Sequence, residues 1–552
     1  MAAIHYFILS VEIVMNLKFK VCFLLISMNQ LVCADPNLNQ LPTGGQITQG
    51  VASINQVGNA LTIQQSTDNI VAEWSSFNIG EAAAVNFLQP NHNSIALNRI
   101  TDQNPSMIYG QLNANGNIYL INPNGIIFGK NAQIDTNGMI ASTLQTSNQD
   151  FFNNTNIFSY GLNSAAGKID NQGRITGHGG VVALIAPQIS NSGSIVNDSG
   201  SIALAAGEKV VLDFSGDGLM TVKVDTAVVN ALIENKGLIK ADAGTVIMTS
   251  HSANAVMDSV INNTGRIQAK TMQNRNGRIV LDAGETGVTT TSGYIDASSG
   301  GEINANNLTQ TNGSITGNNM QFSSFSQTAG VVEAEGNFDV TKNYSQGGVG
   351  GISVGRDAAI NNYSGDLELG NLAVGGVLNV NGFGGDIVQV ENTQLIINGI
   401  SRFDAKNNDN LADVYLDSEG NDFLSGINIS ANNLLLVGSN SLLLGDISAN
   451  GFLDVTAGNN INQTDSGTIN AVGSVIMESL DGLITLNPGK YHFHSDSVLI
   501  DSESIVENIV TSSVNNTEEG FKEADSEFEE GESVESTSAF LNRVSQSPIR
   551  HR

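Results

Sequence analysis

The feature that most constrains this chain is a five-residue pattern that returns along its first half. Asparagine, glycine and isoleucine occupy its first, third and fifth positions, and the pattern begins at Asn171, Asn191, Asn235 and Asn263. A second pattern, in which glycine precedes two alternating apolar residues, begins at Gly180, Gly200, Gly244 and Gly277. In the first three copies the second pattern begins 9 residues after the first, and the first two copies lie 20 residues apart. Such regular spacing indicates a chain built from repeated structural units.

Each apolar run is short and alternates with polar residues, which predicts a strand with one buried face. The Asn and Gly between the runs predict corners in the left-handed αL conformation. Two or three such strands with their corners use about 20 residues, so one coil buries its inward side chains only by stacking on the next. The chain is therefore expected to be all-β, a right-handed parallel β-helix with about 22 coils and a length on the order of 100 Å. A β-sandwich array is the alternative, but it would show hairpin turns and no such period.

The composition supports many short strands with tight turns. The 552 residues include 59 Gly but only 8 Pro, and 40% are hydrophobic against 14% charged. Disordered chains carry more charge and fewer apolar residues than this. The formal net charge of −30 excludes nucleic acid as a partner, because phosphate binding needs a basic surface. The acidic charge fits a soluble exposed surface, with Ca²⁺ or cationic partners as the alternative.

The N-terminal stretch, residues 1–34, predicts a secretory signal peptide, with Met15 as an alternative start. Two lysines precede a short apolar core, small residues lead to a cleavage site after Ala34, and both cysteines of the chain lie in this stretch. A membrane anchor is the rival interpretation, but the apolar core is too short to span a bilayer. No later segment approaches 18 apolar residues, so we expect no transmembrane segment in the mature chain.

A set of ordered motifs between residues 41 and 144 carries a resemblance to a known family. The motifs are Leu41-Pro42-Thr43-Gly44-Gly45, Trp74-Ser75-Ser76-Phe77-Asn78-Ile79-Gly80, Val85-Asn86-Phe87-Leu88-Gln89-Pro90, Ala96-Leu97-Asn98-Arg99-Ile100, Ile108-Tyr109-Gly110-Gln111-Leu112, Ile121-Asn122-Pro123-Asn124-Gly125-Ile126-Ile127-Phe128-Gly129 and Ala141-Ser142-Thr143-Leu144. In order and spacing this set resembles the haemagglutination activity domain, or two-partner secretion (TPS) domain, of filamentous haemagglutinin-like exoproteins. The resemblance extends to about residue 300 and implies a TPS cap domain at the N-terminal end of the β-helix.

The resemblance also implies which residues serve secretion. The candidate secretion and transporter-recognition residues are Asn122, Pro123, Asn124, Gly125, Ile126, Gln89, Pro90 and Asn91. Pro and Gly in the first set suit a rigid β-turn between two apolar strands, so the motif can act through folding or as part of what the transporter recognises. The second set departs from the Asn-Pro-Asn-Leu motif that is common in the family.

The implied mechanism is export through a dedicated outer-membrane β-barrel transporter with periplasmic docking repeats. The protein would then be secreted, or held at the cell surface, with an adhesin or haemagglutinin-like role and a host-cell receptor or carbohydrate as partner. A haem- or haemopexin-binding exoprotein is the first alternative, and a β-helical polysaccharide-acting enzyme is the second. We expect no enzyme activity, since no catalytic signature is present.

Two segments resemble parts of metal sites, but neither is expected to bind a metal. Residues 213–218 resemble the start of a Ca²⁺ loop, but Val224 stands where the bidentate acid is expected. His492 and His494 could share one face of a strand, but two ligands do not make a site. We therefore expect no metal and no cofactor.

The predicted organisation has four parts. Residues 1–34 are the signal peptide, and residues 35–300 are the TPS domain with the first coils. Residues 301–489 are β-helical passenger, in which the repeats become looser but persist. Residues 490–552 are rich in Glu, Ser and Thr and are expected to form an acidic, largely disordered tail.

Overall fold

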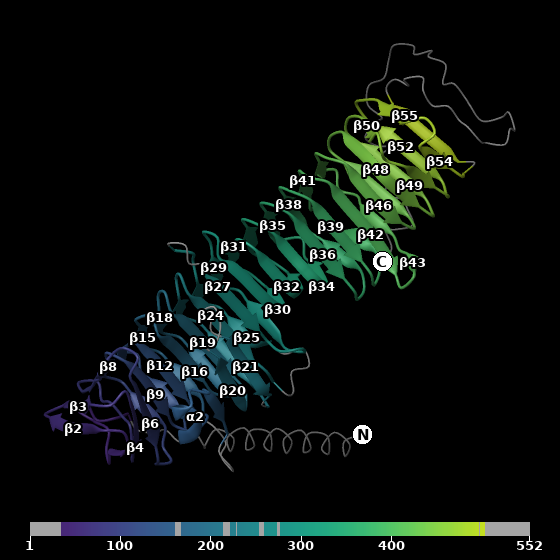
Figure 1. The fold of residues 1–552 in the computed structure, drawn as a ribbon. Helices are drawn as coiled ribbons and strands as arrows, with labels where there is room; N and C mark the ends of the chain where they lie inside the picture. The colour runs from purple at the N-terminus through teal and green to yellow at the C-terminus, as the bar shows by residue number, and fades with distance from the viewer. Residues whose placement is uncertain are drawn as a thin grey trace, which may run out of the picture. The chain divides into compact units, whose positions relative to one another are not determined.

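The computed structural model describes residues 35–160, 167–213, 221–227, 229–252, 259–272, 277–495 and 497–502. The expected signal peptide and most of the acidic tail lie outside these residues. Almost every described strand belongs to a stack of coils, in which parallel strands of successive coils lie side by side (Figure 1). The prediction of a parallel β-helix is confirmed. Most coils have three strands, and the stack has three faces, named the first, second and third face.

The strands of the first face are β4 (Asn69–Trp74), β6 (Ile95–Ile100), β9 (Asn117–Ile121), β12 (Gly138–Ser142), β16 (Val181–Ile185), β19 (Ser201–Ala206), β24 (Thr245–Ser250), β27 (Arg278–Asp282), β30 (Glu302–Gln310), β32 (Met320–Gln327), β34 (Phe338–Gln346), β36 (Ala358–Asn362), β39 (Leu378–Gly382), β42 (Ser401–Asn407), β46 (Ile427–Ala431), β48 (Leu442–Ala449), β51 (Ile469–Ala471) and β54 (Tyr491–Phe493). The three long strands β30, β32 and β34 continue around the corner into the second face, so the two faces form one sheet.

The other strands of the second face are β7 (Ser106–Ile108), β10 (Ile126–Phe128), β14 (Ile169–Asn171), β17 (Gln188–Asn191), β22 (Leu232–Asn235), β25 (Ser259–Asn263), β28 (Val288–Thr291), β37 (Leu367–Leu369), β40 (Ile387–Gln389), β44 (Val414–Leu416), β47 (Leu434–Gly438), β49 (Leu453–Ala457), β52 (Val475–Ser479) and β55 (Val498–Ser502). The strands continue past residue 489, the expected end of the coils, because Tyr491 and Val498 pair in register with Ile469 and Val475.

The strands of the third face are β3 (Ala60–Gln65), β5 (Ala84–Leu88), β8 (Gln111–Ala114), β11 (Gln133–Thr136), β15 (Arg174–Gly177), β18 (Ser194–Val196), β23 (Leu238–Lys240), β26 (Arg266–Gln268), β29 (Tyr294–Ala297), β31 (Ser314–Gly317), β33 (Val331–Ala334), β35 (Gly351–Val354), β38 (Asn371–Val374), β41 (Leu395–Ile397) and β45 (Asp422–Phe423), followed by β50 (Ile461–Gln463) and β53 (Ile484–Thr485), which join through β48. At the N-terminal end, β1 (Gln46–Gln49) and β2 (Ala52–Val57) pair antiparallel to β4 and β3.

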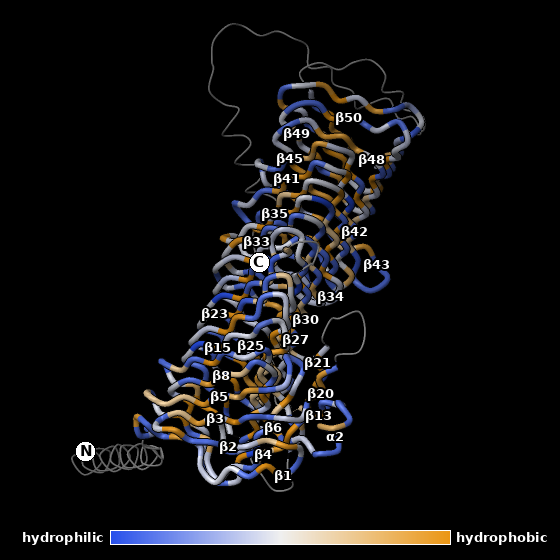
Figure 2. The backbone as a smooth tube through the Cα atoms, turned by 60° about the vertical axis from the view of Figure 1, so that its left-hand side comes forward, coloured by the Kyte–Doolittle hydropathy of each residue, from blue (hydrophilic) through white to orange (hydrophobic). Residues whose placement is uncertain are grey.

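Figure 2 shows apolar segments that recur from coil to coil between hydrophilic corners. The two predicted patterns fall in register: Ile175 pairs with Ile195 on the third face, and Val182 pairs with Ile202 on the first. The apolar side chains of successive coils therefore form one continuous core inside the stack.

The interval between equivalent residues is not constant. Successive equivalent asparagines of the second face lie 20, 44 and 28 residues apart. The longer coils carry segments that leave the stack, among them β20 (Lys209–Asp213) and β21 (Thr221–Thr226). The stack consequently has fewer coils than a uniform 20-residue repeat would give, and the estimate of about 22 coils was too high.

The αL interpretation of the repeated asparagines is wrong. Asn171, Asn191, Asn235 and Asn263 are fully buried at strand ends and have negative φ. Each amide nitrogen donates to the amide oxygen one coil further on, with all three asparagine-to-asparagine distances 2.8 Å. The last rung, Asn263 Nδ2 to Thr291 Oγ1, is 3.1 Å. We call this row the asparagine ladder, and it continues further along the stack as glutamines, with Gln327 Nε2 donating to Gln310 Oε1 at 3.0 Å.

The glycines of the same pattern are required because the backbones of successive coils approach each other closely there. A Cβ on Gly193 would lie 2.1 Å from the carbonyl oxygen of Gly173, and a Cβ on Gly237 would lie 2.0 Å from that of Gly193. Neither Gly193 nor Gly237 has a positive φ. These glycines therefore stack backbone on backbone at the corner between the second and third faces, where no side chain fits.

Candidate functional site

The first predicted secretion motif is a tight turn between β9 and β10. The amide of Gly125 donates to the carbonyl oxygen of Asn122 at 3.1 Å, which closes a β-turn. The Asn122 side-chain oxygen accepts from the Asn124 amide at 3.0 Å, and Gly125 has a φ of 123°, a value that few residues other than glycine adopt. The expected β-turn is therefore present, and the sequence dictates it locally.

The same turn is bonded to the preceding coil through side chains. Asn122 is fully buried, and its Nδ2 donates to Asn104 O at 2.9 Å and Ser106 Oγ at 3.0 Å. The exposed Asn124 donates to Asp102 O at 2.9 Å. Removal of the Asn122 amide would leave buried polar groups without partners, so this residue holds the corner in place.

The turn is also covered by the coil that follows. The Gly167 amide donates to Pro123 O at 2.6 Å, and the Ile126 amide donates to Lys168 O at 3.1 Å. The Ile126 side chain is fully buried in the core. Of the five residues of this motif, only Pro123 and Asn124 are accessible to solvent. Asn122, Gly125 and Ile126 are buried.

The second predicted set, Gln89, Pro90 and Asn91, forms the corner between β5 and β6. Gln89 is buried, and its Nε2 donates to Gln65 Oε1 and Ser94 O, both at 3.1 Å. Pro90 and Asn91 are exposed, and Asn91 Nδ2 donates to Asp68 Oδ1 at 3.0 Å.

The structure does not bring the two sets together. The Gln89 corner precedes the first-face strand β6, whereas the Asn122 turn follows the first-face strand β9. Strands β6 and β9 are parallel neighbours, so the two corners lie at opposite ends of the face. A partner that contacts both sets must therefore span the length of a strand, on the order of 17–20 Å. Whether either set is recognised by a transporter stays a prediction.

Sequence reasoning missed a layer of chain outside the stack. Helix α2 (Asn148–Phe152) and the antiparallel strands β13 (Ile157–Ser159), β20 and β21 form this outer layer, which covers the first face of the early coils. Tyr119 lies beneath it, with ring centroids 5.9 Å from Phe151 and 6.4 Å from Phe158, and burial raises the pKa of Tyr119 to about 12.

The outer layer explains why several strands of the first face are buried on both sides. The outward residues Ile121, Ile140 and Ile185 belong to a second apolar core beneath the layer. The signal was present in the sequence, because β12 and β16 are nearly continuous apolar runs, which is the pattern of a doubly covered strand. The single tryptophan, Trp74, belongs to the inner core and donates from Nε1 to Asn98 Oδ1 at 2.9 Å.

The two segments that resemble parts of metal sites lie at the edge of the described chain. Of residues 213–218 only Asp213 lies within the described chain, and His492 and His494 are both exposed near the C-terminal end of the stack. Among the described residues there is no group of three His, Cys, Asp or Glu side chains that could hold a metal ion.

Two family models match the chain. One is described as the TPS secretion domain and covers residues 39–297. This range includes both predicted secretion sets, the antiparallel cap and the outer layer. Over this range the chain therefore carries the secretion domain of two-partner secretion exoproteins. The second model, described as repeats of unknown function, matches this exoprotein twice, over residues 355–430 and 431–496.

Two curated relatives of this exoprotein are heme/hemopexin-binding proteins. One, from Haemophilus influenzae (strain ATCC 51907 / DSM 11121 / KW20 / Rd), is 31% identical over 274 residues, which is 48% of this chain and 30% of the relative. Another from Haemophilus influenzae is 27% identical over 245 residues, which is 40% of this chain and 26% of the relative. The exoprotein thus matches under a third of the length of either relative.

A solved structure is also similar. It is the crystal structure of the HMW1 secretion domain from Haemophilus influenzae, at 24% identity and a TM-score of 0.42, with 83% of this chain and 100% of that chain covered. In the described part of the exoprotein, no helix combines the length and apolar character needed to cross a membrane.

Proposed function

We propose that this exoprotein leaves the cell through a dedicated outer-membrane β-barrel transporter with periplasmic docking repeats, after cleavage of its signal peptide. The TPS secretion domain over residues 39–297 carries this proposal, because such a domain implies a transporter partner. Outside the cell the chain folds coil by coil and acts in attachment. Nearest-neighbour contacts favour such stepwise folding, since each coil needs only the preceding one as a template.

We further propose that the Asn122 turn serves export mainly by locking its coil. Asn122 bonds to the preceding coil from a fully buried position, while Pro123 and Asn124 are the members that a transporter could touch. A structural role and a recognition role therefore depend on different residues of one motif.

Co-expression with the transporter tests both proposals. The amount of exoprotein in the medium is measured for the wild type and for Asn122→Ala, Asn124→Ala and the control Asn312→Ala, which changes an exposed corner outside residues 39–297. We expect Asn122→Ala to lower export by about tenfold or more, because it removes several buried hydrogen bonds, and Asn124→Ala to lower it much less.

The opposite ranking would assign the motif to recognition. If wild-type protein stays in the periplasm whether or not the transporter is present, the export proposal fails.

A second candidate function is haem or haemopexin binding. It is favoured by the printed names of the two relatives, both heme/hemopexin-binding proteins. Retention of purified exoprotein on haem-agarose, absent for an unrelated β-helical protein, would support it over attachment.

We also propose that the chain is not an enzyme. The matched family model is a secretion domain, and the predicted secretion residues form corners between strands of the stack. Turnover of an acidic polysaccharide by purified protein would contradict this.

A further inference from the structure

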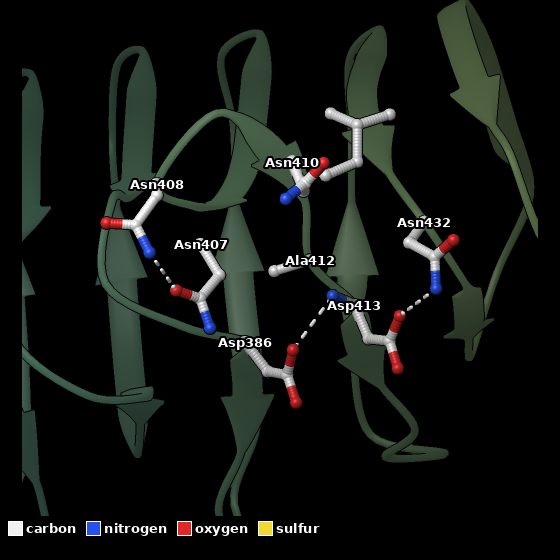
Figure 3. Close-up of a pocket in the computed structure, with 8 residues that line it drawn as sticks. Asp386, Asn407, Asn408, Asn410, Ala412, Asp413 and Asn432 are labelled. Atoms are coloured by element: carbon white, nitrogen blue, oxygen red, sulfur yellow. Dashed lines mark hydrogen bonds between the residues drawn. The ribbon is translucent and has the colours of Figure 1, made fainter.

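A hairpin leaves the stack within the first repeat of unknown function, residues 355–430. The end of β42 pairs antiparallel with β43 (Asn410–Leu411), with Lys406 opposite Leu411 and Asn407 opposite Asn410. Between this hairpin and the neighbouring coils lies an open hollow of about 440 Å³ (Figure 3). Its volume is within the range of small-molecule sites in proteins.

The hollow is lined almost entirely by amides and carboxylates. The lining residues are Asp386, Asn407, Asn408, Asn410, Leu411, Ala412, Asp413 and Asn432. Asn408 Nδ2 donates to Asn407 Oδ1 at 3.1 Å, which leaves the Asn407 Nδ2 donor for a ligand. The Asn410 side chain makes no hydrogen bond within the described chain, so it offers one donor and one acceptor group.

The floor of the hollow is held rigidly. Asp413 accepts from Asn432 Nδ2 at 2.9 Å and from the Tyr415 hydroxyl at 2.5 Å, while its amide donates to Asp386 Oδ1 at 2.9 Å. These bonds join three successive coils beneath the hairpin. A ligand would therefore meet polar groups that are already positioned, which lowers the entropy cost of binding.

Two aromatic rings extend the surface along the same corner. Tyr363 and Phe383, from the two preceding coils, stack with centroids 4.6 Å apart and an interplanar angle of 22°. Tyr363 is 59% exposed. Gly384, which follows Phe383, pairs with Asn407 of the hairpin, so the ring pair adjoins the hollow.

We infer that this corner binds a neutral oligosaccharide. Amides that both donate and accept match the paired hydroxyls of a sugar, and the exposed ring of Tyr363 matches its apolar C–H faces. The described residues that line the hollow include two aspartates and no Lys, Arg or His, so acidic sugars would be repelled. This inference deepens the attachment role proposed above and rests on it for its biological setting.

Calorimetric titration of the purified, full-length chain tests the inference. The probes are maltohexaose, cellohexaose and mannohexaose as neutral sugars, and 3′-sialyllactose and a heparin hexasaccharide as acidic ones. We expect at least one neutral probe to bind with a Kd on the order of 0.1–1 mM. The double variant Asn407→Ala/Asn410→Ala and the variant Tyr363→Ala should each weaken it by about tenfold or more.

The matched control is Asn440→Ala, which changes an exposed asparagine beyond the far end of β47 on the second face and should bind like the wild type. Equal melting temperatures of all variants, which alter only surface side chains, establish that the fold is intact.

Three results would overturn the inference: no neutral probe binds, an acidic probe binds instead, or the variants bind as the wild type does. Because the assay uses purified protein, failure of export leaves the inference standing, and failure of binding leaves the export proposal standing.

Discussion

Single buried side chains decide how one coil aligns on the next. An amide both donates and accepts hydrogen bonds. Asn191, for example, accepts from Asn171 of the preceding coil and donates to Asn235 of the following coil. A shift of register by one residue would turn these amides outward and bring apolar residues to the surface. The ladder therefore specifies register together with the alternating apolar pattern.

Replacement of one asparagine of the ladder should lower the stability of the folded protein. In Asn191→Ala, the Asn171 donor and the Asn235 acceptor lose their shared partner while fully buried, and we expect a loss of about 2 to 4 kcal/mol. Thermal unfolding followed by circular dichroism measures it. Asn262→Ala, on the partly exposed side of β25, is the control and should change little. Equal effects of the two substitutions would contradict the role assigned to the ladder.

One partly buried carboxylate should make stability depend on pH. Burial, and then the nearby Glu478, raises the pKa of Asp454 from 3.8 to about 6. The folded state therefore holds this proton more tightly than the unfolded state, and stability is lost as the pH rises from about 4 to about 6. At neutral pH the ionised Asp454 carboxylate therefore lowers the free energy of unfolding.

Asp454→Asn should accordingly stabilise the protein at pH 7.5, by about 1 to 2 kcal/mol after allowance for solvent screening. The gain should disappear near pH 4, where the wild-type carboxyl is protonated. Melting curves of both proteins at several pH values test this, with the exposed Asp481→Asn as the control. A gain that is constant across pH would point to packing rather than charge.

Strands and turns differ in how well the sequence predicts them. The strands of the repeated patterns could be placed because their period is local, and Val182, Ile202 and Val246 do lie in register. The Asn122 turn could also be predicted, since its chemistry lies within four residues. The apolar runs of β12 and β16 indicate that something covers the first face, but which segments do so could not be predicted, because the outer layer joins segments about 50 residues apart that each lack a period of their own. The hollow could not be predicted either, because its residues come from separate coils.

The outer layer should come loose without unfolding the stack. Phe158 is fully buried between this layer and the first face, and Phe158→Ala should cost about 3 to 4 kcal/mol through the cavity it leaves. Limited proteolysis should then cut within α2, β13, β20 or β21 while the strands of the stack resist. Phe152→Ala, which truncates the exposed neighbouring ring, serves as the control. Equal protection of the two variants would show that the layer does not depend on this core.

Across the whole chain, stability is expected to be local, because each coil contacts only its neighbours. The aromatic cluster around Phe338, which lies 5.5 Å from both Phe322 and Phe325 between ring centroids, marks the middle of the stack. Phe338→Ala should raise amide hydrogen exchange in β32, β34 and β36 and leave β9 and β52 protected. A uniform rise along the chain would instead show that the stack unfolds as one unit.

The glycine stack at the corner has a consequence for how such a chain can lengthen. From Gly173 to Gly313, each coil presents to its successor the same backbone contact that it received from its predecessor. A duplicated segment that spans one whole coil would therefore meet a surface already suited to it, whereas a partial duplication would set a side chain against Gly193 or its equivalents. Growth by tandem gene duplication in this part of the chain is thus restricted to whole coils.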